Sequence, residues 1–406
     1  MSDFSGHVPG SREYRRLLTA LFCAGVATFA QLYAPQAVLP LLADELRVAP
    51  ATAALAVSAS TLGLAVAVIP WSTVADRVGR VPAMATGLIA ATVFGALVPF
   101  SGDLATLLAL RLAEGVALGA VPAVALAYLS EEVDLRYVAA AAGSYIAGTT
   151  VGGLSGRLVS GPLAEAVGWR GGVASAVLLC VLAAVSFVWL VPRSRGFSPE
   201  RGRAPDDRGP SVAVRLWTNL RSPVQLALYA QGFLLMGAFV AVYNYLGFRL
   251  EADPFDLAPG VVTLLFLAYL AGTASSPRAG AWAVRYGRLP VLLASIGVTI
   301  AGAALLAVPQ VVVVLVGLVV FTAGFFGAHA VASGWTPVAA SPVARAQASS
   351  LYYLGYYGGS SLFGWLLGIV FGGAGWGWFL AVVLVMCVLS GALALAALRG
   401  GRAERG

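Results

Sequence analysis

The stretch Ala75-Asp76-Arg77-Val78-Gly79-Arg80-Val81-Pro82 decides the fold. Its polar residues separate two long apolar runs, one from about residue 51 to 74 and one from 82 to 100. A short charged gap between two runs of spanning length indicates a tight turn at a membrane face. The pattern returns as Val284-Arg285-Tyr286-Gly287-Arg288-Leu289-Pro290, so that Arg285 stands 208 residues after Arg77. An offset of half the chain predicts two related halves, of which only the first keeps the acid, Asp76.

The composition excludes an ordinary water-soluble domain. Of the 406 residues, 59% are hydrophobic and 11% are charged, whereas a soluble domain carries about 25% charged residues. Since one crossing takes about 20 apolar residues, we predict an all-α integral membrane protein with twelve transmembrane helices in two pseudo-symmetric six-helix bundles. The expected helices are 17–42, 51–75, 82–100, 103–129, 137–163, 169–192, 223–248, 257–281, 289–308, 311–337, 343–371 and 374–398.

The basic residues set the predicted orientation. All 25 are arginine, and most lie in the two terminal tails, in residues 76–81 or in residues 193–222. The positive-inside rule therefore places both termini in the cytoplasm. It also explains the net charge of +7 without a nucleic acid as partner. The absence of lysine excludes the phosphate-binding loop of an ATPase.

The chain divides into three predicted parts. Residues 1–192 form an N-terminal six-helix bundle, residues 193–222 a cytoplasmic linker rich in arginine, proline and glycine, and residues 223–406 a C-terminal six-helix bundle. Within the linker, residues 212–220 have the pattern of a short amphipathic helix on the inner leaflet, but we favour the alternative, an ordinary solvated tether. The three cysteines lie in apolar runs without disulfide or metal spacing, so we expect no metal and no cofactor.

Three signatures resemble the major facilitator superfamily and, within it, the twelve-helix bacterial exporters of drugs and metabolites. The turn around Asp76 resembles the superfamily's motif between helices 2 and 3. Arg111-x-x-Glu114-Gly115-x-Ala117-x-Gly119 resembles the exporters' helix 4 motif, with Glu114 where glutamine is usual. Gly148-Thr149-Thr150-Val151-Gly152-Gly153 resembles the antiporter motif of helix 5, with Thr149 where proline is usual. The resemblance covers nearly the whole chain and implies a carrier that works by alternating access.

The turn motif predicts a conformational latch made of Asp76, Arg77, Gly79, Arg80, Glu131 and Glu132. The resemblance places Asp76 near the start of helix 11, at about residues 342–345, where a helix dipole favours a carboxylate. Arg80 is expected to pair with Glu131 or Glu132 at the foot of helix 4. The alternative, which we favour for Arg77, is that the arginines only set the topology.

Proton coupling is predicted at Glu114, the one acid deep inside an expected helix. Arg111 stands three residues earlier, on a neighbouring position of the same helix face. A charge at the bilayer centre is costly and marks a functional candidate. We expect Glu114 to take and release the proton while Arg111 competes for its carboxylate, and the alternative is a permanent ion pair that locks helix 4. His329 is a candidate proton relay, with a hydrogen-bonded packing histidine as the favoured alternative.

Small, basic and polar residues complete the predicted sites. Helix 5 carries closely spaced glycines, Gly148, Gly152, Gly153 and Gly156, which we interpret as a sliding interface between the halves, with static packing as the alternative. Arg157 is expected to reach the surface or to pair with Glu165. The resemblance implies a central cavity, and the polar or aromatic residues at its expected positions are the predicted substrate ligands: Gln31, Tyr33, Gln36, Tyr145, Gln231, Asn244, Tyr269, Tyr353 and Tyr357.

These features predict a proton-coupled secondary transporter that exports small organic molecules, neutral or cationic, from the bacterial cytoplasm. We expect a monomer in the inner membrane whose partners are the substrate, protons and lipid. The alternative is an exporter or importer of a sugar or another metabolite with the same fold. An enzyme would need a nucleophile–base pair or a metal cluster within the bilayer. A receptor or scaffold usually carries an appended soluble domain, so we predict a transporter and no enzyme.

Overall fold

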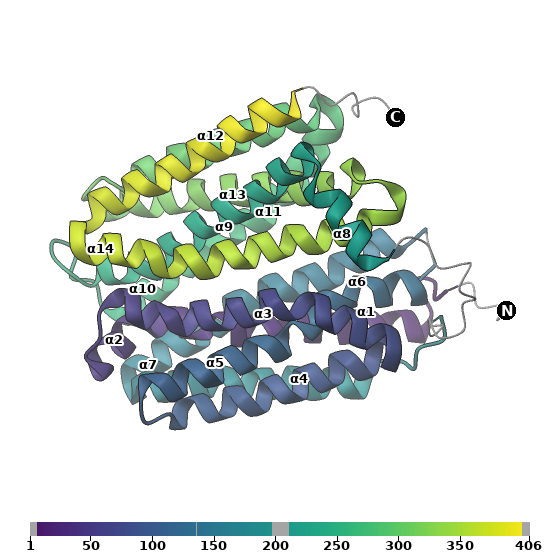
Figure 1. Cartoon of the computed structure of the whole chain (residues 1–406). Coiled ribbons are helices and arrows are strands. Elements are labelled where there is room, and N and C mark those ends of the chain that lie inside the picture. The colour runs from purple at the N-terminus through teal and green to yellow at the C-terminus, as the bar shows by residue number, and fades with distance from the viewer. Residues whose placement is uncertain (1–5, 135, 197–210, 400–406) are drawn as a thin grey trace. The chain divides into compact units, whose positions relative to one another are not determined.

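The structure is a computed structural model that describes residues 6–134, 136–196 and 211–399. Its elements are helices (Figure 1). The first seven are α1 (Arg12–Tyr33), α2 (Leu39–Leu46), α3 (Pro50–Val78), α4 (Arg80–Leu97), α5 (Leu104–Leu118), α6 (Ala120–Glu132) and α7 (Val138–Leu190). The others are α8 (Val212–Leu220), α9 (Pro223–Leu250), α10 (Pro259–Thr263), α11 (Tyr269–Tyr286), α12 (Arg288–Leu305), α13 (Val311–Ala339) and α14 (Arg345–Leu398). Short 3-10 helices occupy Ala34–Val38, Val98–Phe100, Leu264–Ala268 and Pro342–Ala344.

The described chain contains ten continuous helical stretches that are long and apolar enough to cross a bilayer. Two of them, Ala141–Leu190 and Pro342–Leu398, contain 50 and 57 residues, more than twice the roughly 20 that one crossing takes. The backbone leaves helical geometry at Gly168 in α7 and at Gly375 in α14, and Figure 1 shows α14 folding back on itself. Each long stretch is therefore two crossings, and the predicted twelve-helix fold is confirmed for the described residues.

The duplicated turn has the same backbone shape in both halves. Gly79 ends α3 and begins α4 with φ 104° and ψ 156°, and Gly287 joins α11 to α12 with φ 91° and ψ 152°. Only glycine adopts a positive φ of this kind at little cost, which explains why the glycine returns in both copies. The fold-back glycines Gly168 and Gly375 are each followed by tryptophan, so a second turn also repeats at half the chain length.

Contacts between residues divide the chain into two compact units. The first contains Met1–Leu46 and Ala59–Pro205, and the second contains Arg47–Ser58 and Asp206–Gly406. The first unit has a core of small and apolar side chains from α1, α4, α6 and α7, among them Leu21, Met84, Val124 and Phe187. Tyr128 belongs to this core, and its hydroxyl donates to the Pro192 carbonyl at 3.0 Å.

The predicted linker is structured at its second end. Residues 212–220 form α8, as the amphipathic pattern predicts. Nδ2 of Asn219 is buried and donates to the Ala344 carbonyl at 3.0 Å, so α8 is fastened to the second unit. The favoured interpretation as a solvated tether is therefore wrong for this part of the linker, while residues 197–210 lie outside the described residues.

Candidate functional site

The end of α1 is the centre of the candidate site in the first unit. α1 stops at Tyr33, and the chain continues as the 3-10 helix Ala34–Val38. Pro35 explains the change, because proline has no N–H to donate to the carbonyl four residues earlier, which here belongs to Gln31. Within the hydrocarbon region such a carbonyl needs another donor. The break in the first membrane helix therefore requires buried hydrogen-bond donors.

Arg111 of α5 supplies these donors. Its Nη1 donates to the Gln31 carbonyl at 3.2 Å and its Nη2 to the Leu32 carbonyl at 2.8 Å. Nη1 also lies 2.5 Å from Oε2 of Glu114, so the spacing of three brings the two charges together as predicted. Both residues are 1% exposed. The structure thus adds a feature that the spacing did not predict, since the same guanidinium holds Glu114 and the broken end of α1.

Gly95 of α4 makes room for the polar groups beside this ion pair. A Cβ added at Gly95 would lie 2.9 Å from Oε1 of Glu114 and 3.0 Å from Nε2 of Gln31. Nε2 of Gln31 is buried and has no hydrogen-bond partner among the described residues. The predicted proton carrier and one predicted substrate ligand therefore belong to a single buried polar cluster, which we call the Arg111 cluster (Gln31, Leu32, Gly95, Arg111 and Glu114).

A second buried arginine, Arg157 of α7, binds the 3-10 segment. Its Nε and Nη2 donate to Oε1 of Gln36 at 2.8 and 2.6 Å, and its guanidinium carbon lies 4.4 Å from the centre of the Tyr33 ring. Nη1 donates to the Gly153 carbonyl at 2.5 Å. Arg157 is 0% exposed, so the expectation that it reaches the surface is wrong. Inside the bundle, Arg157 instead contacts the Gln36 amide and the Tyr33 ring at the break in α1.

The glycines of the predicted interface, which lie in α7, pack against α1 within the first unit. A Cβ added at Gly152 would lie 2.6 Å from the Val26 carbonyl oxygen, and one at Gly156 would lie 2.5 Å from that of Ala30. Gly148 approaches the Phe22 carbonyl in the same way, while Gly153 faces the Arg157 side chain. The interpretation as a sliding seam between the halves is therefore wrong for these four glycines, because their bare faces meet groups of their own unit.

Tyr145 lies on the same helix as these glycines and is part of the hydrophobic core. It is twelve residues, or about 18 Å along a helix, from Arg157. Of the four substrate ligands predicted in the first unit, the break in α1 thus brings together Gln31, Tyr33 and Gln36 and leaves Tyr145 apart.

In the second unit, Gln231 is a structural tie between α9 and the end of α14. Its Nε2 donates to the carbonyls of Ala227 and Ser390, both at 3.1 Å, and its Oε1 accepts from the Ser390 hydroxyl at 2.5 Å. Donor and acceptor groups of this amide are therefore engaged by the protein. The interpretation of Gln231 as a substrate ligand is wrong. By contrast, Nδ2 of Asn244 makes a longer bond of 3.3 Å to the Gly364 carbonyl.

The predicted aromatic ligands of the second unit fall into two neighbouring groups. Tyr269 packs on Phe239, Tyr243 and Phe326, with ring centres 4.9–5.8 Å apart. Nδ1 of His329 lies 2.9 Å from the Tyr352 hydroxyl, and its ring contacts those of Tyr353 and Tyr356. Tyr357 joins this group through its ring contacts with Tyr353 and Tyr356. His329 thus has the hydrogen bond of the favoured packing alternative, and a role as relay stays a prediction.

Three charged residues meet at the repeated turn, and of their contacts the sequence predicted only the Arg80–Glu131 pair. Arg80 donates to Asp76 and, from Nε and Nη2, to Glu131 at 3.0 and 2.7 Å. It therefore ties the end of α3 to the end of α6. Of the two predicted partners of Arg80, Glu131 is the one found. Arg77 is exposed, in keeping with a topological role.

Glu132 does not belong to this charged cluster. Its side chain is 0% exposed, and its Oε1 accepts from the backbone N–H groups of Arg195 and Gly196 at 2.7 and 2.9 Å. The His7 backbone N–H donates to the Glu132 carbonyl at 2.7 Å. The expectation that Glu132 forms part of the latch with Arg80 is corrected, since it fastens the start of the linker and the N-terminal tail.

Asp134, in the short loop after α6, stays ionised because it is paired with an arginine. Arg136 donates to both carboxylate oxygens of Asp134, at 3.0 and 2.8 Å. These hydrogen bonds lower the pKa of Asp134 to about 2.

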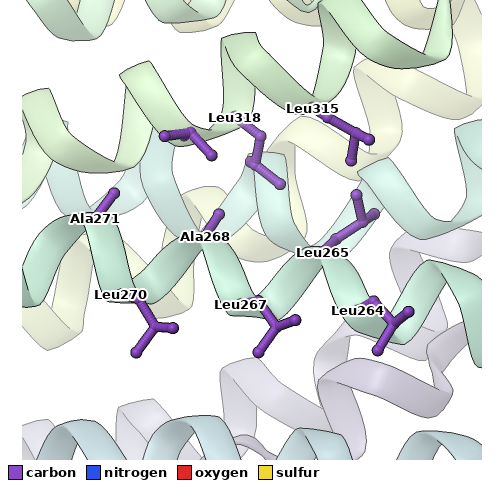
Figure 2. Close-up of a pocket in the computed structure, with 9 residues that line it drawn as sticks. Leu264, Leu265, Leu267, Ala268, Leu270, Ala271, Leu315 and Leu318 are labelled. Atoms are coloured by element: carbon purple, nitrogen blue, oxygen red, sulfur yellow. The ribbon is translucent and has the colours of Figure 1, made fainter.

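A hollow of about 330 Å³ lies between the α10–α11 segment and α13, and its lining is entirely aliphatic (Figure 2). Figure 2 shows Leu264, Leu267 and Leu270 projecting away from Leu315 and Leu318. These five leucines include four that are more than 40% exposed, as lipid-facing residues are. None of the predicted site residues lines this hollow, so it is not the candidate site.

Comparison with known proteins identifies the family to which the chain belongs. The pattern of the Major Facilitator Superfamily matches residues 21–327. The chain is 40% identical over 386 residues to the inner membrane transport protein YnfM of Escherichia coli (strain K12), covering 94% of this chain and 91% of that protein. It is 36% identical over 381 residues to an uncharacterized MFS-type transporter, YybF, of Bacillus subtilis (strain 168), covering 94% and 93%.

Solved structures agree on the fold. A bacterial homologue of the human lysosomal transporter Spinster, in an inward-facing and unoccupied conformation, has a TM-score of 0.77 at 17% identity, covering 98% of this chain and 99% of that chain. The nucleoside transporter NupG (D323A mutant) has a TM-score of 0.73 at 16% identity, covering 94% and 99%. With its twelve crossings, its duplicated turn and these relatives, the chain belongs to the major facilitator superfamily and is a multi-pass membrane transport protein.

Proposed function

We propose that this transporter is a proton-coupled exporter of small organic molecules that works by alternating access. The observation that carries the proposal is the buried Arg111–Glu114 ion pair at the break in α1. Through Arg111, the Glu114 carboxylate, which can be protonated, is connected to the end of α1. In the family this helix lines the cavity. Such a position allows one proton to change the geometry of the cavity wall.

The proposed coupling follows from the hydrogen bonds of Arg111. Protonation of Glu114 at Oε2 removes the negative charge that holds Nη1, so the guanidinium shifts toward the Gln31 and Leu32 carbonyls. Loss of the proton restores the ion pair. Because Arg111 and Glu114 are both removed from water, the change of charge on Glu114 is weakly screened and alters the hydrogen bonds that Arg111 makes to α1.

The proposed substrate contacts are those groups that the structure leaves near the helix break or in the aromatic groups. They are Gln31, Tyr33 and Gln36 in the first unit and Asn244, Tyr269, Tyr353 and Tyr357 in the second. Aromatic faces and amide groups suit neutral or cationic organic molecules. We place both termini in the cytoplasm of a bacterial cell, with the transporter acting as a monomer in the inner membrane.

The second candidate is an exporter or importer of a sugar or another metabolite. The feature that favours it is Thr149, where the antiporter motif has proline. The Thr149 hydroxyl donates to the Ile146 carbonyl at 2.8 Å within a continuous helix, so the structural effect of that proline is missing here. Uptake of candidate compounds into inverted membrane vesicles, with and without a pH gradient, distinguishes the two. Gradient-driven accumulation of organic cations supports drug export, and accumulation of sugars alone supports the second candidate.

Replacing Glu114 by glutamine tests the proton carrier. Glutamine has nearly the same shape and can still accept a hydrogen bond from Arg111, but it does not titrate. We expect substrate accumulation driven by the pH gradient to fall at least tenfold, while the protein remains folded. The measurement is the substrate-induced change of internal pH in inverted vesicles, reported by a pH-sensitive dye.

Asp44→Asn is the matched control for that variant. It removes an exposed carboxylate from the same unit and is expected to leave the dye signal unchanged. Full proton movement by the Glu114→Gln variant would exclude Glu114 as the carrier and leave the permanent ion pair as its role.

Replacing Asp76 by asparagine tests the charged cluster at the repeated turn. Asp76 and Glu131 share the Arg80 guanidinium, and a hydrogen bond to a charged group contributes about 1.5–3 kcal/mol. We expect transport to fall by at least tenfold at an unchanged protein level, measured as the initial rate in vesicles. Asp134→Asn, which removes an acid from a local loop pair, is expected to retain most of the rate. An unimpaired rate in the Asp76 variant would reduce the cluster to a topological signal.

A further inference from the structure

A polar pocket of about 340 Å³ opens where α1 begins and α7 ends. Among its lining residues are His7, Glu13, Arg16, Arg193 and Arg195. Three arginines face one glutamate, which leaves an excess of positive charge in the pocket. The proposed transport mechanism uses none of these residues.

The backbone around the pocket is fixed. Nε and Nη2 of Arg16 donate to the carbonyls of Leu190 and Trp189 at 3.2 and 3.1 Å, so Arg16 caps the end of α7. The N–H groups of Arg195 and Gly196 are held by the buried Glu132 carboxylate. The backbone that lines the pocket and the Arg16 side chain are therefore held in place by the fold.

An exposed apolar stripe on α7 leads to this pocket. Leu178, Leu182, Val185 and Trp189 are spaced by four, three and four residues, which places them on one face of the helix. They are 60–78% exposed. Trp189 lies one residue before the end of α7, where tryptophan marks the level of the lipid headgroups. The pocket thus lies at headgroup depth, at the end of a surface suited to an acyl chain.

We propose that this pocket binds the phosphate headgroup of an anionic phospholipid, such as phosphatidylglycerol, whose acyl chain lies along the α7 stripe. The arginines provide the charge that a phosphodiester needs, and basic pockets at the ends of membrane helices bind such headgroups. The Glu13 carboxylate opposes anions, and it repels the doubly charged form of inorganic phosphate more strongly than a singly charged phosphodiester. The stripe supplies the apolar contacts that inorganic phosphate cannot make.

Lipid binding to the purified full-length protein tests the proposal. Dissociation constants for phosphatidylglycerol are measured by native mass spectrometry for the unaltered protein and for the double variant Arg193→Gln/Arg195→Gln. Each arginine near an anionic headgroup contributes about a fivefold factor, so we expect binding to weaken by about 25-fold. The side chains of both residues are replaced while the N–H groups that bind Glu132 remain.

The matched control is Arg12→Gln/Arg15→Gln, which removes the same charge from exposed positions at the same end of α1 and is expected to change the constant by less than threefold. Phosphatidylcholine and inorganic phosphate are the control probes and are expected to bind at least tenfold more weakly. An equal loss in both double variants would show unspecific attraction to charge and overturn the proposal. Equally tight binding of inorganic phosphate would overturn the assignment to a lipid.

Discussion

Replacing Arg111 by alanine is expected to lower the free energy of unfolding by about 3–5 kcal/mol, the usual loss when one partner of a buried ion pair is removed. The variant leaves the Glu114 carboxylate at 1% exposure without its cation. It also removes the donors that the Gln31 and Leu32 carbonyls receive at the break in α1. These losses act together because one guanidinium serves all three acceptors.

The measurement is thermal or denaturant unfolding in detergent, compared with Arg136→Ala. The Arg136 side chain is 74% exposed in its own ion pair, so its removal is expected to change stability by less than about 1 kcal/mol. The double variant Arg111→Ala/Glu114→Ala is expected to be less destabilised than the sum of the two single variants, since it leaves no buried charge alone. An Arg111→Ala variant within about 1 kcal/mol of the unaltered protein would contradict this prediction and show that Glu114 is neutralised by a proton or hydrated once its cation is gone.

The fold was predictable because its signals are local or repeated. The duplicated turn could be predicted from the return of Gly79 as Gly287, and the structure gives both glycines a similar positive φ. The contact between Arg111 and Glu114 was predictable for a similar reason, since a helix places residues three apart side by side. In both cases the spacing of the residues along the chain is enough to predict their arrangement in space.

The residues that were misjudged have partners far away in the sequence. Arg157 binds Gln36, 121 residues earlier, and Gln231 binds Ser390, 159 residues later. Composition and spacing cannot show which helix faces lie together, and so a buried arginine resembled a surface one and a structural amide resembled a ligand. The reason is different for Glu132. Its partners are backbone N–H groups of the linker, and since nearly every residue type has such a group, the sequence does not single them out.

One missed feature did have a signal in the sequence. Pro35 removes the N–H that would bond to the Gln31 carbonyl, so a buried donor was required somewhere near the end of α1. Arg111 and Arg157 lie inside the expected helices 103–129 and 137–163. Joining those two observations would have predicted that arginines hold the break, as the structure shows for both.

Replacing Gly152 by leucine is expected to separate α1 from α7 and lower the free energy of unfolding by about 3 kcal/mol, the upper part of the usual range for overpacking. Even a Cβ at this position would lie 2.6 Å from the Val26 carbonyl oxygen and 2.7 Å from its Cα. These neighbours are backbone atoms, which cannot avoid the clash by changing rotamer as a flexible side chain can. Because α1 carries the break that Arg111 holds, we expect transport to fall with stability.

Gly143→Leu is the control on the same helix. A Cβ there has no heavy atom within 4 Å, and leucine favours a helix by nearly 1 kcal/mol over glycine, so this variant is expected to be as stable as the unaltered protein. Unfolding in detergent and transport in vesicles are measured for both variants. Equal stability of the two would mean that α1 moves away from α7 at little cost, and the close packing of these helices would then be a place where the first unit can slide.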